Sequence, residues 1–214
     1  SVGGWIVFEE DFRDANALRG LEGFSHIWLL WGFSANRPVR HSGQSRGVSW
    51  SPTVRPPRLG GNTSMGVFAT RSPYRPNPLG LSAVKLEKIE FSGSVGPVLH
   101  VSGADLMDGT PIYDIKPYVT YADAVPDAAS GFVDVNPWQP LTVVIPDELR
   151  QQLLDGLPGA KEGLLHLKAL EEILAQDPRP QYSHGSKIYG LAYGPWNIRF
   201  TVAGTTLTVI SIEK

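Results

Sequence analysis

The chain has 214 residues, a formal net charge of −2 and no cysteine. A chain of this length can bury a substantial core, so we expect one domain with a smaller second one. The lack of cysteine excludes disulfides, thiolate metal sites and cysteine nucleophiles, and it is typical of a cytoplasmic protein. No apolar run reaches the roughly 18–20 residues of a membrane helix. The chain starts without methionine or a signal-peptide pattern, so we expect its natural start to lie upstream.

Residues 5–8 are predicted to form a strand, and the continuous apolar run over 26–33 predicts a central strand buried on both faces. Residues 37–57 then form a long segment rich in Arg, Ser, Gly and Pro, and loops of this length in compact domains are usually functional. Trp50 in this segment can stack on a nucleic-acid base or anchor the loop, and the sequence does not decide between these roles.

Positive charge is concentrated in one part of the sequence. No Asp or Glu lies between Glu22 and Glu87, whereas seven arginines and Lys85 do. A block of one sign in a near-neutral chain indicates a local surface for a polyanion such as RNA. The alternative is a solvated loop that happens to be rich in arginine. The arginines that we expect to contact RNA are Arg40, Arg46, Arg55, Arg58 and Arg75.

The stretch over residues 65–84 is the most distinctive in the chain. Its apolar residues 67–69 predict a short buried strand, which leads into a loop that carries Arg71, Arg75 and three prolines. Proline fixes its own φ and restricts the residue before it, so Asn77, between two prolines, has few conformations. Gly80 permits a turn before the next strand. A rigid loop with guanidinium groups loses little entropy when it binds a ligand.

The next part of the chain predicts further short strands. Residues 83–91 and 97–103 form two strands joined by a hairpin turn at 92–94, and residues 111–116 form a third strand. Asp108 and Gly109 form a turn signal of the kind that sets hairpin register. Several short strands separated by Gly/Pro turns predict a mainly β fold, either a β-barrel or a strongly curved sheet.

The composition becomes small and polar around 125–140, and we place a domain boundary after residue 137. Pro146 opens a short helix, and a second helix ends before Pro178. The second helix has a leucine stripe that predicts its buried face, and three strands follow it as a meander. The sequence therefore predicts a β-barrel domain over 1–137 and a small α+β domain over 138–214. The leucines of the stripe are Leu164, Leu167, Leu170 and Leu174.

Several common sites are excluded. No Gly-x-Gly-x-x-Gly follows a predicted strand and no P-loop is present, so a Rossmann-type or P-loop nucleotide site is not indicated. The five histidines are scattered without zinc-like spacing, and we expect no metal site. No nucleophile elbow frames the Ser, His and Asp residues. The residues alone therefore predict a β-barrel with a basic segment and a rigid Arg/Asn loop.

The stretch over 65–84 closely resembles the signature of the TsaA-like (TrmO) family, and so do residues 23–28, 55–62, 105–111 and 114–118. This resemblance covers most of the chain. It implies a β-barrel that uses S-adenosylmethionine to methylate N6 of threonylcarbamoyladenosine, next to the anticodon of tRNA. It also implies a homodimer, in which the second subunit completes the cofactor cleft.

The resemblance also implies site residues. Arg71 can pair with the methionyl carboxylate of the cofactor in a bidentate manner. Asp108, Asn77 and Lys116 are the candidates to orient or accept the N6 proton, and we do not choose among them. The residues expected to bind the cofactor are Ser34, Ala35, Arg71, Leu81, Met107, Asp108, Gly109 and Thr110.

The chain departs from the family pattern at two points. Ser34 stands where the family has histidine, so the role of that imidazole does not carry over to this chain. The family's N-terminal Pro-Arg-Gln segment does not occur in this sequence, so we expect weaker cofactor binding. Two other classes remain open. A non-catalytic RNA-binding barrel would bind no cofactor. A small-molecule-binding or hydrolytic domain, whose arginines recognise carboxylate or phosphate, would be indifferent to tRNA.

Overall fold

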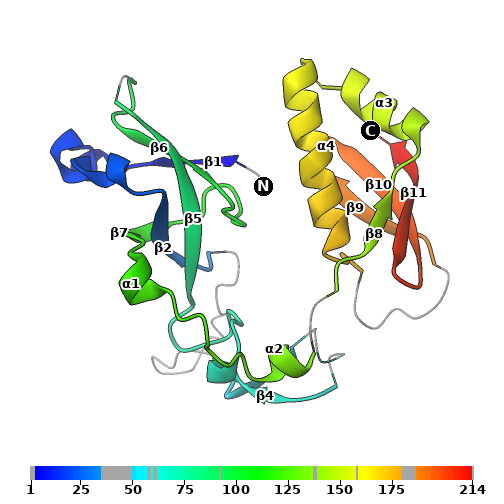
Figure 1. Ribbon diagram of the computed structural model, residues 1–214, viewed down its shortest axis with the longest axis horizontal. Helices are drawn as coiled ribbons and strands as arrows, with labels where there is room; N and C mark the ends of the chain where they lie inside the picture. Colours follow the sequence, from blue (N-terminus) through cyan, green and yellow to red (C-terminus); the bar gives the residue numbers. More distant parts are fainter. Residues whose placement is uncertain are drawn as a thin grey trace, which may run out of the picture. The chain divides into compact units, whose positions relative to one another are not determined.

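The computed structural model divides the chain into two compact units (Figure 1). The first comprises Ser1–Pro56 and Asn62–Ala128, and the second comprises Pro57–Gly61 and Ala129–Lys214. No helix in the described ranges is long and apolar enough to cross a membrane. The structure describes residues 3–34, 50–56, 59, 62–91, 93–136, 139–157, 159–179 and 187–213.

The first unit is built on an antiparallel sheet with the strand order β1-β6-β5-β2-β7. Among the described residues, β1 and β7 are the sheet edges. The predicted mainly β class is confirmed, whereas closure of the sheet into a barrel stays a prediction. The strands are β1 (Gly3–Val7), β2 (His26–Gly32), β5 (Leu79–Glu90), β6 (Val98–Ser102) and β7 (Ile112–Pro117).

The central strand β2 shows how the core forms. Ile27 and Leu29 point to one face and are fully buried, and in the register with β5 they face Val84 and Ser82. On the other face Trp28 and Leu30 are only partly buried. The predicted strand is confirmed, but the expectation of burial on both faces is wrong, because the described residues cover the face of Trp28 and Leu30 only in part. The core cluster is Ile6, Leu18, Ile27, Leu29, Val84, Leu86, Leu99 and Val101.

Irregular segments connect these strands. Three 3-10 helices follow β1, namely η1 (Glu10–Phe12), η2 (Ala15–Leu18) and η3 (Leu21–Gly23), and a short helix α1 (Thr120–Asp123) follows β7. The Asp108–Gly109 turn is present, but it does not form a hairpin. It connects β6 to β7, which are not neighbours, because β5 and β2 lie between them in the sheet.

The segment predicted as a buried strand at 67–69 is instead a 3-10 helix, η5 (Val67–Ala69). It follows the two-residue strand β4 (Met65–Gly66), which pairs with β3 (Thr53–Val54). The Thr70 N–H donates to the Val67 carbonyl at 3.1 Å and closes the turn, so the side chains stop alternating. Val67 is therefore buried, whereas Phe68 is 71% exposed.

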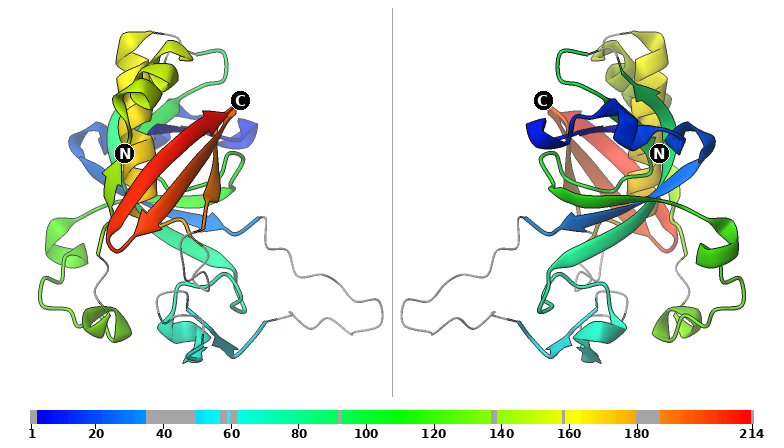
Figure 2. Two further views of the ribbon diagram at one scale, coloured as in Figure 1. Left: turned by 90° about the vertical axis from the view of Figure 1, so that its right-hand side faces the viewer. Right: turned by 90° about the vertical axis from the view of Figure 1, so that its left-hand side faces the viewer.

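The second unit has a four-stranded sheet in the order β8-β11-β10-β9, and Figure 2 shows α3 and α4 on one face of it. The meander of the last three strands is confirmed. The sequence did not predict β8, which pairs parallel to β11. The elements are α2 (Phe132–Val135), β8 (Thr142–Val144), α3 (Asp147–Asp155), α4 (Ala160–Ala175), β9 (Tyr189–Tyr193), β10 (Trp196–Ala203) and β11 (Thr206–Glu213).

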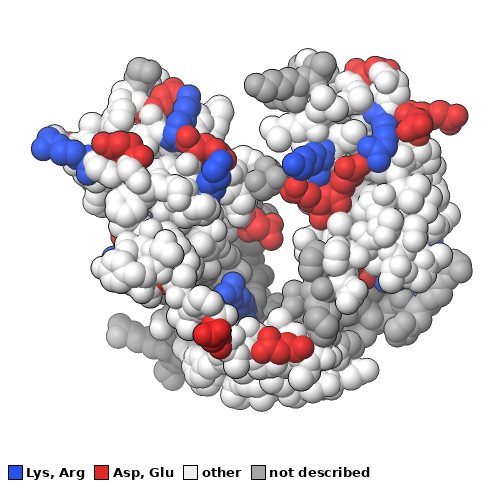
Figure 3. All heavy atoms as spheres, viewed as in Figure 1, with Lys and Arg blue, Asp and Glu red and all other residues white. Residues whose placement is uncertain are grey.

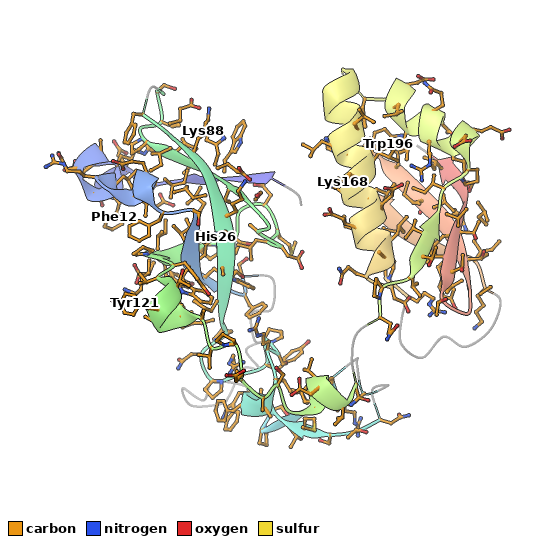
Figure 4. The ribbon with its side chains drawn as sticks, in the orientation of Figure 1. Phe12, His26, Lys88, Tyr121, Lys168 and Trp196 are labelled. Carbon is orange, nitrogen blue, oxygen red and sulfur yellow. The ribbon has the colours of Figure 1, made fainter. Side chains whose placement is uncertain are left out.

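The core of this unit follows from regular periodicities. Alternate residues of β10, beginning with Trp196, point inward and pack with the leucines of α4 (Figure 4). Of the predicted leucine stripe, Leu164 is 60% exposed, so that part of the prediction is wrong. Gly163 is buried in its place, because an added Cβ there would lie 3.0 Å from Leu154 Cδ2 of α3. Leu164 follows Gly163 by one residue, which is about 100° around the helix, so it lies outside the buried face.

Candidate functional site

Three segments of the first unit meet where β2 ends. The Gly32 N–H donates to the Pro111 carbonyl at 3.0 Å, and the Phe33 N–H donates to the Pro78 carbonyl at 2.9 Å. The residues after β2 are therefore held between the proline-rich loop before β5 and the turn before β7. This end of the sheet brings together parts of the chain that the sequence separates by more than 70 residues, from Ser34 to Thr110.

Most residues predicted to bind the cofactor lie on these three segments. Ser34 is exposed directly after β2, and Asn77 is exposed in the loop before β5. Leu81 lies opposite Leu30 on the less covered face of the sheet and is also exposed. Ala35 lies outside the described residues.

The turn before β7 presents two side chains to solvent. The backbone N–H and the hydroxyl of Thr110 both donate to the Met107 carbonyl, at 3.1 and 2.7 Å. Gly109 completes the turn at φ +72°, a conformation that glycine adopts without steric cost. Met107 and Asp108 are thus exposed, and Asp108 has no hydrogen bond or ion pair with another described residue.

A close approach of an aromatic ring shapes the same end of the sheet. An added Cβ on Gly80 would lie 2.2 Å from Trp31 Cε2, so only glycine leaves room for this ring. Trp31 donates from Nε1 to Ser82 Oγ at 3.1 Å, and its ring lies 4.5 Å from that of Phe33. Gly80 lies inside β5 rather than in a turn before it, and its lack of a side chain leaves room for the Trp31 ring that contacts Phe33. A glycine within a strand pattern is the sequence signal for such a close approach.

Lys116 lies away from this end. Lys116 of β7 pairs with Trp28 of β2. Trp28 is four residues before Gly32, so Lys116 lies about 13 Å along the strands from the end of β2. Its Nζ forms an ion pair with Asp114 Oδ2 at 3.0 Å. The hydrogen bond from Lys116 lowers the pKa of the Asp114 carboxyl. The structure does not bring Lys116 together with Asn77 and Asp108.

The predicted arginines differ in their environment. Arg71 and Arg55 are exposed and pair with no carboxylate of the described chain. Arg75 is half-buried, donates from Nη1 to the Thr70 carbonyl at 3.0 Å, and lies 5.9 Å from the centre of the Phe68 ring. Arg40, Arg46 and Arg58 lie outside the described residues.

Paired charges characterise another part of the same unit. Along β5, Lys85 pairs with Glu87 and Lys88 with Glu90, each at 2.8 Å. Figure 3 accordingly shows basic and acidic side chains side by side over this part of the unit. Because their charges are locally compensated, these lysines contribute little to a positive surface. In the part of the chain that the structure describes, no group of three His, Cys, Asp or Glu residues could hold a metal ion.

One feature of the site was missed from the sequence. Trp50 and Phe68 form a stacked pair with ring centres 6.1 Å apart and an interplanar angle of 30°. The sequence leaves Trp50 either to stack on a base or to anchor its loop, and it predicts Phe68 within a short buried strand. No local pattern in the sequence links these two residues, which lie in different segments.

The fold and the site define a class: a mainly β unit that gathers exposed polar and apolar groups at one sheet end, followed by an α+β unit. Comparison with protein families identifies the family within this class. The tRNA-methyltransferase O N-terminal domain matches residues 1–124, and the TrmO C-terminal domain matches residues 138–214. The chain belongs to the TrmO family.

Individual relatives agree with this. The chain is 40% identical over 218 residues to the tRNA (adenine(37)-N6)-methyltransferase of Escherichia coli K12. The matched region covers 100% of this chain and 86% of that protein. It is 44% identical over 171 residues to a Pseudomonas aeruginosa protein provisionally named an S-adenosylmethionine-dependent methyltransferase, covering 80% and 67% of the two chains. The crystal structure of TrmO from P. aeruginosa superposes with a TM-score of 0.72 at 33% identity, over 99% of this chain and 84% of that one.

Proposed function

We propose that this chain transfers a methyl group from S-adenosylmethionine to N6 of adenine 37 in tRNA. The observation that carries the proposal is the match of both family domains, in order, along the chain. The relative from E. coli is named for this reaction, and the match covers the whole of this chain and 86% of that relative.

The residues at the end of the sheet fit the cofactor chemically. Arg71 has no carboxylate partner among the described residues, so it is available for the methionyl carboxylate. Leu81 and Met107 are exposed apolar side chains that can cover the adenosine or the methylthio group. Gly109 and Thr110 offer backbone groups to the adenine edge, Ser34 offers a hydroxyl, and Ala35 stays part of this proposal from the sequence.

The cofactor, when bound, supplies an electrophilic methyl group on a sulfonium. The chain must then orient the acceptor nitrogen and take up the proton that leaves N6. Asp108 has an exposed carboxylate without a partner in the described chain, so it can accept this proton. Asn77, in the restricted Pro-Asn-Pro segment, can orient the amine by a hydrogen bond. We assign Lys116 no direct part, because it lies about 13 Å along the strand from the site end.

The RNA side of the site is proposed to use the arginines. Arg55 is exposed and can bind a phosphate. Arg75 uses Nη1 for the Thr70 carbonyl, which leaves its other guanidinium donors for the carboxylate of a threonylcarbamoyl group on the target adenosine. Arg40, Arg46 and Arg58 remain candidates for further phosphate contacts from the sequence alone.

The assembly is part of the proposal. Leu79, Leu81, Met107 and Tyr113 are exposed around the site, so a single copy leaves much apolar surface in water. A homodimer in which a second copy covers this surface would enclose the cofactor. We also propose that residues 1–137 carry the chemistry as a closed barrel and that 138–214 form a separate α+β domain, in a cytoplasmic enzyme.

The deciding experiment is methyl transfer from labelled S-adenosylmethionine to tRNA transcripts with and without the threonylcarbamoyl group. We expect methylation of the modified tRNA and much weaker methylation of the unmodified one, because a site built for a carboxylate loses its partner. Equal methylation would contradict the threonylcarbamoyl assignment, and no methylation of either would contradict the reaction. Sedimentation of fully active protein as a monomer would contradict the dimer.

A further inference from the structure

We propose that Trp50, Phe68 and Arg75 form an aromatic platform on which an unpaired base of the tRNA anticodon loop stacks, next to the adenosine that is methylated. This inference rests on the proposed function for the identity of the RNA. It adds a binding surface to that function, and it resolves the two roles of Trp50 that the sequence left open.

The geometry of the platform suits a base. The two rings are stacked, with centres 6.1 Å apart, and the Arg75 guanidinium lies 5.9 Å from the centre of the Phe68 ring. Trp50 is 44% exposed and Phe68 71% exposed, so ring surface faces solvent. A base has a π face for the rings. Arg75 keeps guanidinium donors beyond Nη1, so it can contact the phosphate beside this base as well as the threonylcarbamoyl carboxylate.

The platform is held rigidly before any ligand binds. Val67 is buried and anchors η5, and its N–H donates to the Pro52 carbonyl at 3.0 Å. The Thr70 hydroxyl donates to the Val67 carbonyl at 2.9 Å, and the Ser51 N–H, next to Trp50, donates to the Tyr74 carbonyl at 3.4 Å. Hydrogen bonds therefore hold the backbone just after Trp50 and around Phe68, so little entropy is lost when a base stacks.

Charge favours RNA over a second copy of the chain as the occupant. The sequence from 23 to 86 contains no acidic residue, and Arg55, Arg71 and Arg75 lie in the same part of it as the platform. A two-fold contact between identical platforms would bring these cations opposite each other without a compensating carboxylate. A polynucleotide supplies negative charge along its whole length.

The test uses a synthetic anticodon stem–loop RNA with 2-aminopurine at the position next to the target adenosine. Stacking on an aromatic side chain quenches the fluorescence of this base. We expect Phe68→Ala and Trp50→Ala to abolish most of the quenching and to weaken binding about fivefold to a hundredfold. Phe68→Tyr keeps a π face and should restore both signals.

Phe12→Ala is the matched control. Phe12 also lies in a three-residue 3-10 helix, η1, and it is 69% exposed, against 71% for Phe68 (Figure 4). Its removal should change neither quenching nor affinity. Titration between about 50 and 200 mM salt separates the two parts of the platform. Phe68→Ala should keep the salt slope of the parent, whereas Arg75→Gln should reduce its magnitude by about 0.7.

Three results would overturn the platform: parental affinity and quenching in Phe68→Ala, an equal loss in Phe12→Ala, or a sedimentation shift in Phe68→Ala that reveals a protein interface. These outcomes are independent of the proposed reaction. If Phe68→Ala binds RNA normally while the parent methylates tRNA, the platform fails and the function stands. If the parent methylates no tRNA but Phe68→Ala still loses RNA binding and quenching, the function fails and the platform stands.

Discussion

The two units of this protein differ in the exposure of their aromatic residues. Among the described residues, every exposed aromatic lies in the first unit, whereas the second unit has none. Trp196 and Phe200, by contrast, are buried in the core of the second unit. The exposed aromatics of the first unit are Trp5, Phe12, Phe24, Trp50, Phe68, Tyr74, Phe91, Tyr113 and Tyr121.

This contrast indicates a division between stability and recognition. In the second unit the aromatic rings complete a core between one sheet face and two helices, so they contribute mainly to folding. In the first unit Tyr113 is exposed beside Gly32 at the end of β2, and Trp50 and Phe68 form an exposed stacked pair. These rings are available to contact a ligand. Contiguous exposed apolar patches often mark interaction sites, whereas a single exposed ring such as Phe12 needs no such role.

The largest effect that would test the contrast is on stability. Phe200→Ala should lower the free energy of unfolding by about 3–5 kcal/mol, because it leaves a cavity where a fully buried ring packs against Tyr189. Phe12→Ala in the first unit should change it by less than about 0.5 kcal/mol. Urea denaturation measures both. Similar losses in the two variants would remove the distinction between core and surface rings.

The second effect concerns the site end of the first unit. Gly80→Ala places a Cβ 2.2 Å from the Trp31 ring, so the ring must move and the support of Phe33 is lost. We expect a destabilisation of about 1–3 kcal/mol together with a clear drop in methyl transfer. Gly23→Ala is the control, since an added Cβ there meets nothing within 4 Å. Unchanged activity in Gly80→Ala would show that this packing does not shape the site.

The third effect is confined to binding. Arg71→Ala should weaken S-adenosylmethionine binding roughly tenfold to a hundredfold, because a charge-assisted pair typically contributes about 1.5–3 kcal/mol. Calorimetry measures the affinity, and Arg199→Ala in the second unit is the control. Identical affinities for Arg71→Ala and the parent would remove Arg71 from the cofactor site.

The smallest effect is a pH dependence in the second unit. The hydrogen bond from Arg179 lowers the pKa of Asp177 in the folded state, so the pair stabilises the fold above the unfolded pKa of about 3.9. This stabilisation is lost as the pH falls through the lower folded pKa. Asp177→Asn should therefore cost less than about 1 kcal/mol at pH 7 and nothing near pH 2. Asparagine tolerates the φ of +55° at this position.

A loss in Asp177→Asn that is as large at pH 2 as at pH 7 would contradict this origin. Arg179→Gln provides the second half of the test, because it removes the same ion pair from the other side. Because both changes remove the same ion pair, the double variant should be no less stable than the less stable of the two single variants.

The sequence by itself determined the elements whose pattern is local. The apolar run of β2, the hairpin of β5 and β6, the meander of the last three strands and most of the leucine stripe follow from periodicity and turn residues. The motifs over 65–84 and 105–111 identified the family, because a rigid Pro-Asn-Pro loop and a Met-Asp-Gly-Thr turn are specific sequences. The predicted site residues before β5 and before β7 lie in these motifs, whereas Ser34 and Ala35 after β2 were implied only by the family resemblance.

Only the tertiary structure decided what depends on partners distant in the sequence. Phe68 has the composition of a strand residue, but hydrogen bonds from Val67 to Pro52 and from Thr70 to Val67 turn the backbone and expose it. Its stacking partner Trp50 lies in a different segment, and Lys116 is separated from Asn77 by strand register. α3 packs on Gly163 of α4, and the neighbouring Leu164 is left exposed. Periodicity specifies which residues share a face, whereas packing against a remote segment determines which of them are covered.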